Sequence, residues 1–310
     1  NGAIEALQSP NQATRYLGWQ TLQTAGPKAE SALAKMMASN VPQYRARALW
    51  ALGKLPIDKS SKLKYLEQAI QDDNPDLRIT AIRLMRQLQG EINKQDLVDL
   101  LNIFDDSPAV RREMLIGLRD THLPESAQYW TDLATQYDGK DRWYLEALGI
   151  AAEKHWNEYL ANWLDRVGSN WNSDAGRDII WRSRADQTAS LLLKIIEDPS
   201  TRVEELPRYF RSLDFCPTVP QDELAKVAFS KHGEAGRTDL IVSESIARLK
   251  NLNFEAHPEY KQALNDLLAS QSESQSFLTI VDRFNLEEQY PELVNVATKH
   301  SGEQLGIDAA

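Results

Sequence analysis

The sequence predicts an all-α fold in which pairs of helices repeat along the chain and stack as an α-α superhelix, or solenoid. The first observation is that four prolines stand 32, 33 and 33 residues apart: Pro10, Pro42, Pro75 and Pro108. The second is that apolar residues follow helical spacing behind these prolines, whereas no run alternates apolar and polar residues as a strand would. A fixed period of this length indicates stacked supersecondary units instead of a globule with one closed core.

Each proline is expected to open the first helix of a unit. Proline is tolerated at the first helical position because its missing N–H would have had no partner there. The residues before three of the prolines are of the types that cap helix N-termini: Ser9, Asn74 and Ser107. Aspartate pairs at 72–73 and 105–106 favour the same position, because the N-terminal end of a helix dipole attracts negative charge.

Behind each first helix we expect a second, amphipathic one. In the unit that Pro75 opens, the apolar positions of this second helix are Leu97, Leu100, Leu101 and Phe104. Neither helix of a pair can bury its apolar stripe alone, so the units must stack. About eight or nine helical pairs fit the 310 residues at the repeat length of about 33.

The period loosens along the chain. The stretch from Gly139 to Arg142 is expected to open a first helix without a proline. We expect regular repeats over residues 1–168 and degenerate repeats over 174–310, with a kink near 168–174; two separate domains are the alternative. Further helical stretches are expected around 179–196, 206–215, 224–229, 240–249, 260–268 and 277–284, with one more helix beginning at Leu305. Because the chain stops within that last pattern, we expect it to be a piece of a longer protein.

An arginine follows three residues after three of the prolines, at Arg45, Arg78 and Arg111, and Arg142 opens the unit that lacks a proline. These arginines are interpreted as structural positions that bond the acidic turn of a neighbouring unit. We expect Arg78 and Arg111 to be largely buried and bonded to carboxylates or helix-end carbonyls. The alternative is a ladder of exposed cations that binds an anionic partner.

A non-repeating cluster is the candidate interaction surface: Arg177, Trp181, Arg182 and Arg184. Tryptophan flanked by arginines is typical of the residues that dominate binding energy at protein interfaces. Ile179 and Ile180 show that the same helix has a buried face, so a core role for Trp181 is equally compatible with the pattern.

No catalytic residue, metal ligand or cofactor site is predicted. The chain has no haem-attachment motif, glycine-rich phosphate loop or nucleophile-elbow motif, and its five histidines are scattered. An enzyme that uses His155, Glu158 or the region of His232 is a rival hypothesis, and Cys216 is interpreted as a small buried residue at a helix end. No stretch approaches the roughly 20 apolar residues of a membrane span, so membrane insertion by this segment is not expected.

The charge balance disfavours nucleic acid as a partner. The chain carries 45 acidic and 35 basic residues, for a net charge of −10. A nucleic-acid-binding repeat protein needs a basic groove to neutralise phosphates. That rival stays open, because a local arginine stripe could be hidden within a negative total.

Several segments resemble a known family: LGWQTL (17–22), RARALWALGKL (45–55), DRWYLEALGIAAE (141–153), DIIWRSRA (178–185) and LPRYFRSLDF (206–215). Together they resemble the HEAT-type helical region of large bacterial membrane-bound dehydrogenases, also described as haem-binding domain proteins. The resemblance implies a scaffold of short HEAT-like repeats between a sugar-dehydrogenase-like propeller and a c-type cytochrome, in an extracytoplasmic (periplasmic) setting. It implies protein domains, in cis or in trans, as partners, and it carries over no catalytic or haem-binding position.

Overall fold

The computed structural model describes residues 2–93, 95–96, 99, 104–120, 123–230, 232–250 and 258–310. Over these ranges every regular element is a helix and no strand is present, which confirms the all-α class. The chain divides into two compact units, Asn1–Ile179 (unit 1) and Ile180–Ala310 (unit 2). The kink expected near residues 168–174 stays a prediction.

Unit 1 consists of helices joined by short connections. Its α-helices are α1 (Gly2–Gln8), α2 (Gln12–Ala25), α3 (Glu30–Met37), α4 (Pro42–Lys54), α5 (Lys59–Ile70), α6 (Pro75–Gln87), α8 (Pro108–Leu118), α9 (Ser126–Ala134), α10 (Arg142–Ala152), α11 (Trp156–Val167) and the start of α12 (Asp174–Arg182). Two 3-10 helices, η1 (Gly26–Ala29) and η2 (Gly168–Asn172), join the series.

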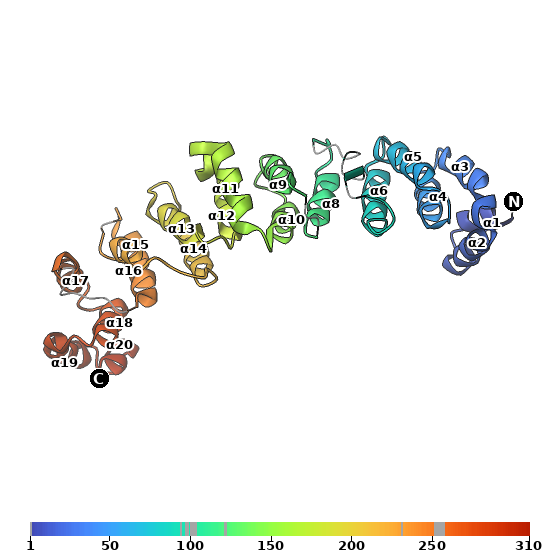
Figure 1. The fold of residues 1–310 in the computed structure, drawn as a ribbon. Coiled ribbons are helices and arrows are strands. Elements are labelled where there is room, and N and C mark those ends of the chain that lie inside the picture. Colours follow the sequence, from blue (N-terminus) through green and yellow to red (C-terminus); the bar gives the residue numbers. More distant parts are fainter. Residues whose placement is uncertain are drawn as a thin grey trace. The chain divides into compact units, whose positions relative to one another are not determined.

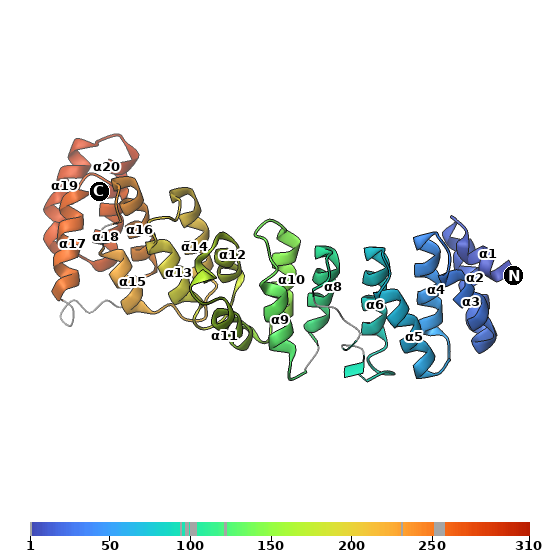
Figure 2. The same ribbon diagram turned by 90° about the horizontal axis from the view of Figure 1, so that it is seen from above.

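The helices of unit 1 form two rows (Figure 1). In the first row α4 packs on α6, α6 on α8, and α8 on α10, and Figure 2 shows these four helices side by side. The second row holds α3, α5, α9 and α11, of which α5 packs between α4 and α6 and α9 contacts α8, α10 and α11. We call α4, α6, α8 and α10 the first-helix row and the other four the second-helix row. The core lies between the rows, where Leu33, Leu52, Leu66 and Leu84 are almost fully buried.

The helix starts follow the proline pattern at three of four positions. Pro42, Pro75 and Pro108 are the first residues of α4, α6 and α8, as predicted. The prediction for Pro10 is wrong by two residues, because α2 begins at Gln12. Asn11 caps this helix by accepting a hydrogen bond from the backbone N–H of Thr14 at 3.1 Å.

The predicted caps are only partly correct. Asn74 caps α6 by accepting from the backbone N–H groups of Asp76 and Leu77, as predicted. The predictions for Ser9 and Ser107 are wrong: neither side chain caps a helix, and the Ser107 N–H instead donates to Asp105 at 2.9 Å. The expected start of α10 is confirmed, with Asp141 as its cap. The apolar positions predicted at Leu97, Leu100 and Leu101 lie outside the described residues. The prediction for Phe104 is wrong, because this residue lies in a turn and is 65% exposed.

Unit 2 begins within α12 and continues through α13 (Thr188–Glu197), α14 (Leu206–Leu213), α15 (Gln221–Ala228), α16 (Ala235–Arg248), α17 (Pro258–Ser270), α18 (Gln275–Phe284), α19 (Tyr290–Lys299) and α20 (Gln304–Ala309), with 3-10 helices η3 (Val203–Glu205) and η4 (Glu287–Gln289). Contacts again join helices close in sequence, such as α13 with α14 and α15, and α16 with α14 and α18.

The stretch expected around 179–196 holds two helices, because the chain breaks between α12 and α13. There the Ser183 hydroxyl accepts from the backbone N–H of Ala185, and the Arg184 guanidinium bonds the carbonyl of Trp181. The helices α1 and α19 were not predicted. Among the described residues no helix combines the length and apolarity needed to cross a membrane.

A pH-sensitive contact joins two turns of unit 2. The imidazole of His300 lies 2.9 Å from a Glu303 carboxylate oxygen and 3.5 Å from one of Glu273, which also binds Lys299. The hydrogen bond to Glu303, followed by that to Glu273, raises the pKa of His300 above its ordinary value of 6.5. A raised pKa in the folded state contributes stability below the unfolded pKa, and that contribution is lost as the pH rises through the folded pKa.

We therefore predict that His300→Gln flattens the dependence of the melting temperature on pH between about pH 6 and 8. The wild-type chain should lose more thermal stability over this interval than the variant, measured by circular dichroism at a series of pH values. Parallel curves for the two proteins would contradict this role for His300.

Candidate interaction site

The turn before each first helix repeats the same hydrogen bond at a spacing of 33 residues. The side chains of Ser39, Asp72, Asp105 and Asp138 each accept a bond from the backbone N–H two residues further on, at 2.9–3.1 Å. A side chain that bonds its own backbone in this way fixes the turn without help from a neighbour. This turn therefore recurs at the repeat spacing, with a hydroxyl in the first copy and a carboxylate in the other three.

Arg78 connects two of these turns. Its Nε and Nη2 donate to the two carboxylate oxygens of Asp105, both at 2.8 Å, and Nη2 also lies 2.6 Å from Asp106. Its Nη1 donates to the backbone carbonyls of Asp72 and Asp73 at 2.9 and 3.3 Å. Arg78 is only 9% exposed. It thus makes the contacts expected of a structural arginine.

Arg45 and Arg111, the other arginines that follow a proline, make only some of the contacts that Arg78 makes. Arg45 donates to the carbonyl of Ser39 at 2.9 Å and to the Asp72 carboxylate at 2.8 Å. Arg111 donates to the carbonyl of Asp105, but it is half-buried, where we expected it to be largely buried.

Arg142 differs from the three arginines that follow prolines, because it is exposed and pairs with Glu146 of its own helix. The position 33 residues after Arg111 is Tyr144, whose hydroxyl accepts from Arg111 Nε at 3.3 Å. At α10 the arginine of the preceding first-row helix therefore bonds a tyrosine hydroxyl, whereas Arg45 and Arg78 bond aspartate carboxylates.

The predicted surface cluster is split between the two units. In unit 1, Arg177 is buried and its Nε donates to the Asn172 side chain at 2.8 Å, so it serves the local structure. In unit 2, Trp181 and Arg182 are half-buried, and the Trp181 ring lies 4.9 Å from the guanidinium of Arg208.

Two residues that contact the part of the cluster in unit 2 were not predicted from the sequence. Arg208 covers the Trp181 ring, and the exposed Phe215 ring lies 5.3 Å from the guanidinium of Arg184. Both belong to the segment 206–215, which α14 brings back against the end of α12. Spacing within one helix could not reveal a pairing between two helices.

The residues considered for catalysis lie apart. His155 precedes α11 and stacks on the Tyr159 ring, with 5.3 Å between ring centroids, while Glu158 is exposed. The Nε2 of His232 lies 2.7 Å from the carbonyl oxygen of Val227. Cys216 is half-buried after the end of α14, and burial raises the pKa of its thiol. In the part of the chain that the structure describes, no group of three or more His, Cys, Asp or Glu could hold a metal ion.

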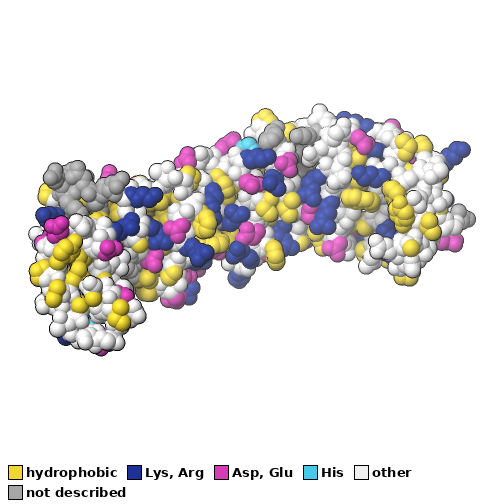
Figure 3. Space-filling model, turned by 90° about the horizontal axis from the view of Figure 1, so that it is seen from below, with side chains coloured by type: hydrophobic (Ala, Val, Ile, Leu, Met, Phe, Trp, Pro, Cys, Tyr) yellow, Lys and Arg dark blue, Asp and Glu magenta, His cyan; other side chains and the backbone are white. Residues whose placement is uncertain are grey.

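The first-helix row is basic, although the whole chain is acidic. Its four helices hold nine Lys or Arg and three Asp or Glu, whereas the four helices of the second-helix row hold five of each. The chain as a whole has a net charge of −10. Figure 3 views the molecule from the side of the first-helix row and shows Lys and Arg side chains among apolar ones.

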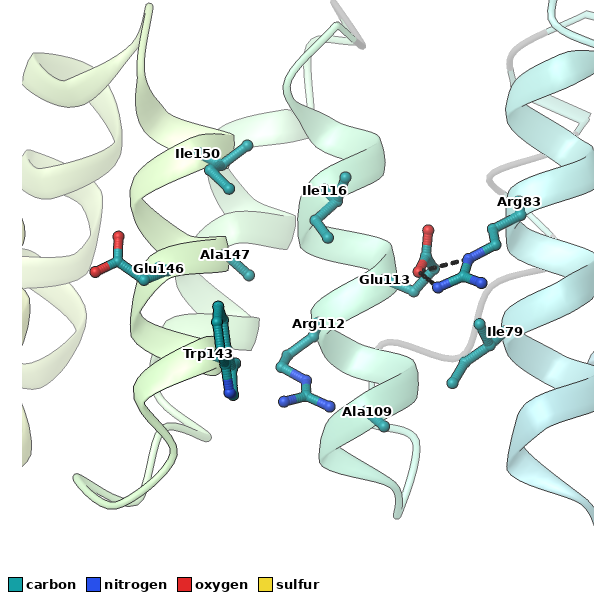
Figure 4. Close-up of a pocket in the computed structure, with 10 residues that line it drawn as sticks. All are labelled: Ile79, Arg83, Ala109, Arg112, Glu113, Ile116, Trp143, Glu146, Ala147 and Ile150. Carbon is teal, nitrogen blue, oxygen red and sulfur yellow. Dashed lines mark hydrogen bonds and ion pairs between the residues drawn. The ribbon is translucent and has the colours of Figure 1, made fainter.

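A hollow of about 430 Å³ lies on this row, between α6, α8 and α10 (Figure 4). Its lining is mostly apolar, with charged groups at the edges: Ile79, Arg83, Ala109, Arg112, Glu113, Ile116, Trp143, Glu146, Ala147 and Ile150. Trp143 is 73% exposed and Ile116 is 37% exposed, so large apolar side chains face solvent here. Arg112 and Trp143 project from neighbouring helices toward the same opening.

Ion pairs neutralise only part of the charge around this hollow. The carboxylate of Glu113 is 7% exposed and pairs with both Arg83, at 2.9 Å, and Arg86, at 2.6 Å. Two guanidinium groups share one carboxylate, so one positive charge is left over. Arg112 lies 3.2 Å from Asp141, and both side chains of this pair are partly exposed. The hollow therefore combines an apolar surface with charged edges, where two arginines and two glutamates line it and Arg86 adds a further positive charge beside Glu113.

Neither a scan against models of protein families nor a search of curated proteins finds a match for this chain.

The buried position of Arg78 gives a direct test of its structural role. Arg78→Ala would remove the ion-pair partner of the buried Asp105 carboxylate and leave it only the bond from the Ser107 N–H, and removal of one partner of a buried pair costs about 3 kcal/mol. We expect a loss of this size in the free energy of unfolding, measured with urea. The matched control is Arg83→Ala, which removes a guanidinium that is 58% exposed and leaves Glu113 paired with Arg86. This control should lose less than about 1 kcal/mol, and equal losses in the two variants would contradict the assignment.

Proposed function

We propose that this chain is a non-catalytic scaffold, an α-solenoid of short HEAT-like repeats that binds a partner protein through the first-helix row of unit 1. The observation that carries the proposal is the hollow on that row, where exposed apolar side chains and arginines meet. Aromatic residues and arginine are enriched at the centres of protein interfaces.

The repeated contacts support the solenoid. In such proteins each repeat contacts only its neighbours, and stability is a sum over repeats and the interfaces between them. In unit 1 the first-row helices pack on their neighbours in order, and the bonds of Arg45 and Arg78 recur at the repeat spacing. The turn-forming side chains recur at the same spacing.

The setting in a redox protein is a further part of the proposal. It rests on the resemblance of five segments to the helical region between a propeller and a c-type cytochrome. The full-length reading frame would test it: a propeller sequence upstream and a CxxCH motif downstream would support the setting, and their absence would remove it. The scaffold role itself does not depend on this setting.

Site-specific photo-crosslinking tests the scaffold role. A benzophenone amino acid at Ile116, in the hollow, should capture a protein partner in cells of the source organism. The same group at Val203, a comparably exposed position in unit 2, serves as the matched control. We expect a captured protein from position 116 alone, and the purified protein should then bind the purified chain. Equal capture at both positions, or no binding of the purified protein, would contradict the proposal.

A further inference from the structure

We infer that the hollow between α6, α8 and α10 binds a partner segment of a particular chemistry: a peptide with one large apolar side chain flanked by carboxylates. The inference rests on the proposed function, since it names the partner class for the same face.

The apolar part of the hollow accounts for the central side chain. Ile79, Ile116 and Ile150 lie on three successive first-row helices, and Trp143 stands exposed beside them. These side chains point outward from the core between the rows, so intramolecular packing does not explain their type. A hollow of about 430 Å³ is within the range of about 300–1,000 Å³ typical of ligand sites. An apolar side chain seated there would remove these isoleucines and the Trp143 ring from water.

The charge distribution accounts for the flanking carboxylates. Three of the basic residues of the first-helix row, Arg45, Arg78 and Arg111, bond the turns, and the others include the partly exposed Arg83, Arg86 and Arg112 near the hollow, in a chain whose net charge is −10. An acidic segment is therefore repelled by the chain as a whole and attracted to this row, which gives the row its selectivity.

Specific arginines are placed to receive the carboxylates. Arg83 and Arg86 share Glu113, which leaves a positive charge beside the hollow. Arg112 is 30% exposed and lies on the side of the hollow nearest Trp143, where its guanidinium has further N–H groups to donate to a second carboxylate besides Asp141.

The same features disfavour nucleic acid as the occupant. A phosphate backbone has no apolar group that would cover the isoleucines of the hollow. Proteins that bind single strands generally use several aromatic platforms along a basic groove. Among the described residues that line the hollow, Trp143 is the one aromatic residue.

The test uses the full chain and a fluorescein-labelled synthetic peptide with one phenylalanine between two pairs of aspartates, followed by fluorescence anisotropy. We expect saturable binding, weakened at least about tenfold when the phenylalanine is replaced by alanine or the aspartates by lysines. Trp143→Ala and Arg112→Glu should each weaken binding by about the same factor. The matched controls are Phe215→Ala and Arg202→Glu, exposed positions in unit 2 that should leave binding unchanged. Circular dichroism checks that each variant is folded. Trp143→Ala should fold normally, because the side chain that it removes is exposed.

The outcomes separate this inference from the proposed function. If the peptide does not bind while crosslinking at position 116 still captures a specific protein, the inference fails and the scaffold role stands. If the peptide does not bind and position 116 captures no specific protein, both the inference and the scaffold role fail. If single-stranded DNA binds with the same dependence on Trp143 and the peptide does not, the face binds nucleic acid and the inference is overturned.

Discussion

The bond from Arg78 to two successive turns is the interaction on which the arrangement of unit 1 depends. Helices of this length bury only one face, and each gains most of its stability from its neighbours. The guanidinium of Arg78 fixes the neighbours' register, because it holds the Asp105 carboxylate and the carbonyls of Asp72 and Asp73 at the same time. The planar group suits this task, since it offers several donors in one rigid geometry. The turn that receives it is already shaped by its own aspartate, so the arginine joins two preformed parts.

The arginines of the first-helix row fall into two groups, those that bond the turns and those that lie near the hollow. Arg45, Arg78 and Arg111 point into the turns and contribute little to the outer surface. Arg83, Arg86 and Arg112 lie instead around the hollow, where one buried carboxylate, that of Glu113, orders the first two. Structural and surface arginines thus lie on the same helices but serve different roles. Changes in the surface arginines should alter binding and cost little stability, whereas a change in a buried arginine such as Arg78 should cost stability.

Much of the fold follows from the sequence, because prolines and cap residues act locally. The positions of Pro42, Pro75 and Pro108 correctly predicted the starts of three helices, and Asn74 was correctly predicted as a cap. Ser107 shows the limit of such reasoning, since it stands at the N-cap position of α8 but its side chain makes no capping bond. The hollow was not predicted, because it forms between three helices that begin at Pro75, Pro108 and Arg142, far apart in the sequence. A signal was nevertheless present: Ile79, Ile116 and Ile150 fall outside the buried stripe of their own helices. The pairing of Trp181 with Arg208 likewise joins two helices and has no signature within either one.

The central claim is that the arginine contacts couple neighbouring helices and act over a short range. Hydrogen–deuterium exchange of the wild-type chain and the Arg78→Ala variant measures this directly. We expect the backbone amides of α6 and α8 to exchange faster in the variant, while those of α13 and α14 in unit 2 keep their protection. Unchanged exchange in α6 and α8, or an equal increase throughout both units, would contradict the claim.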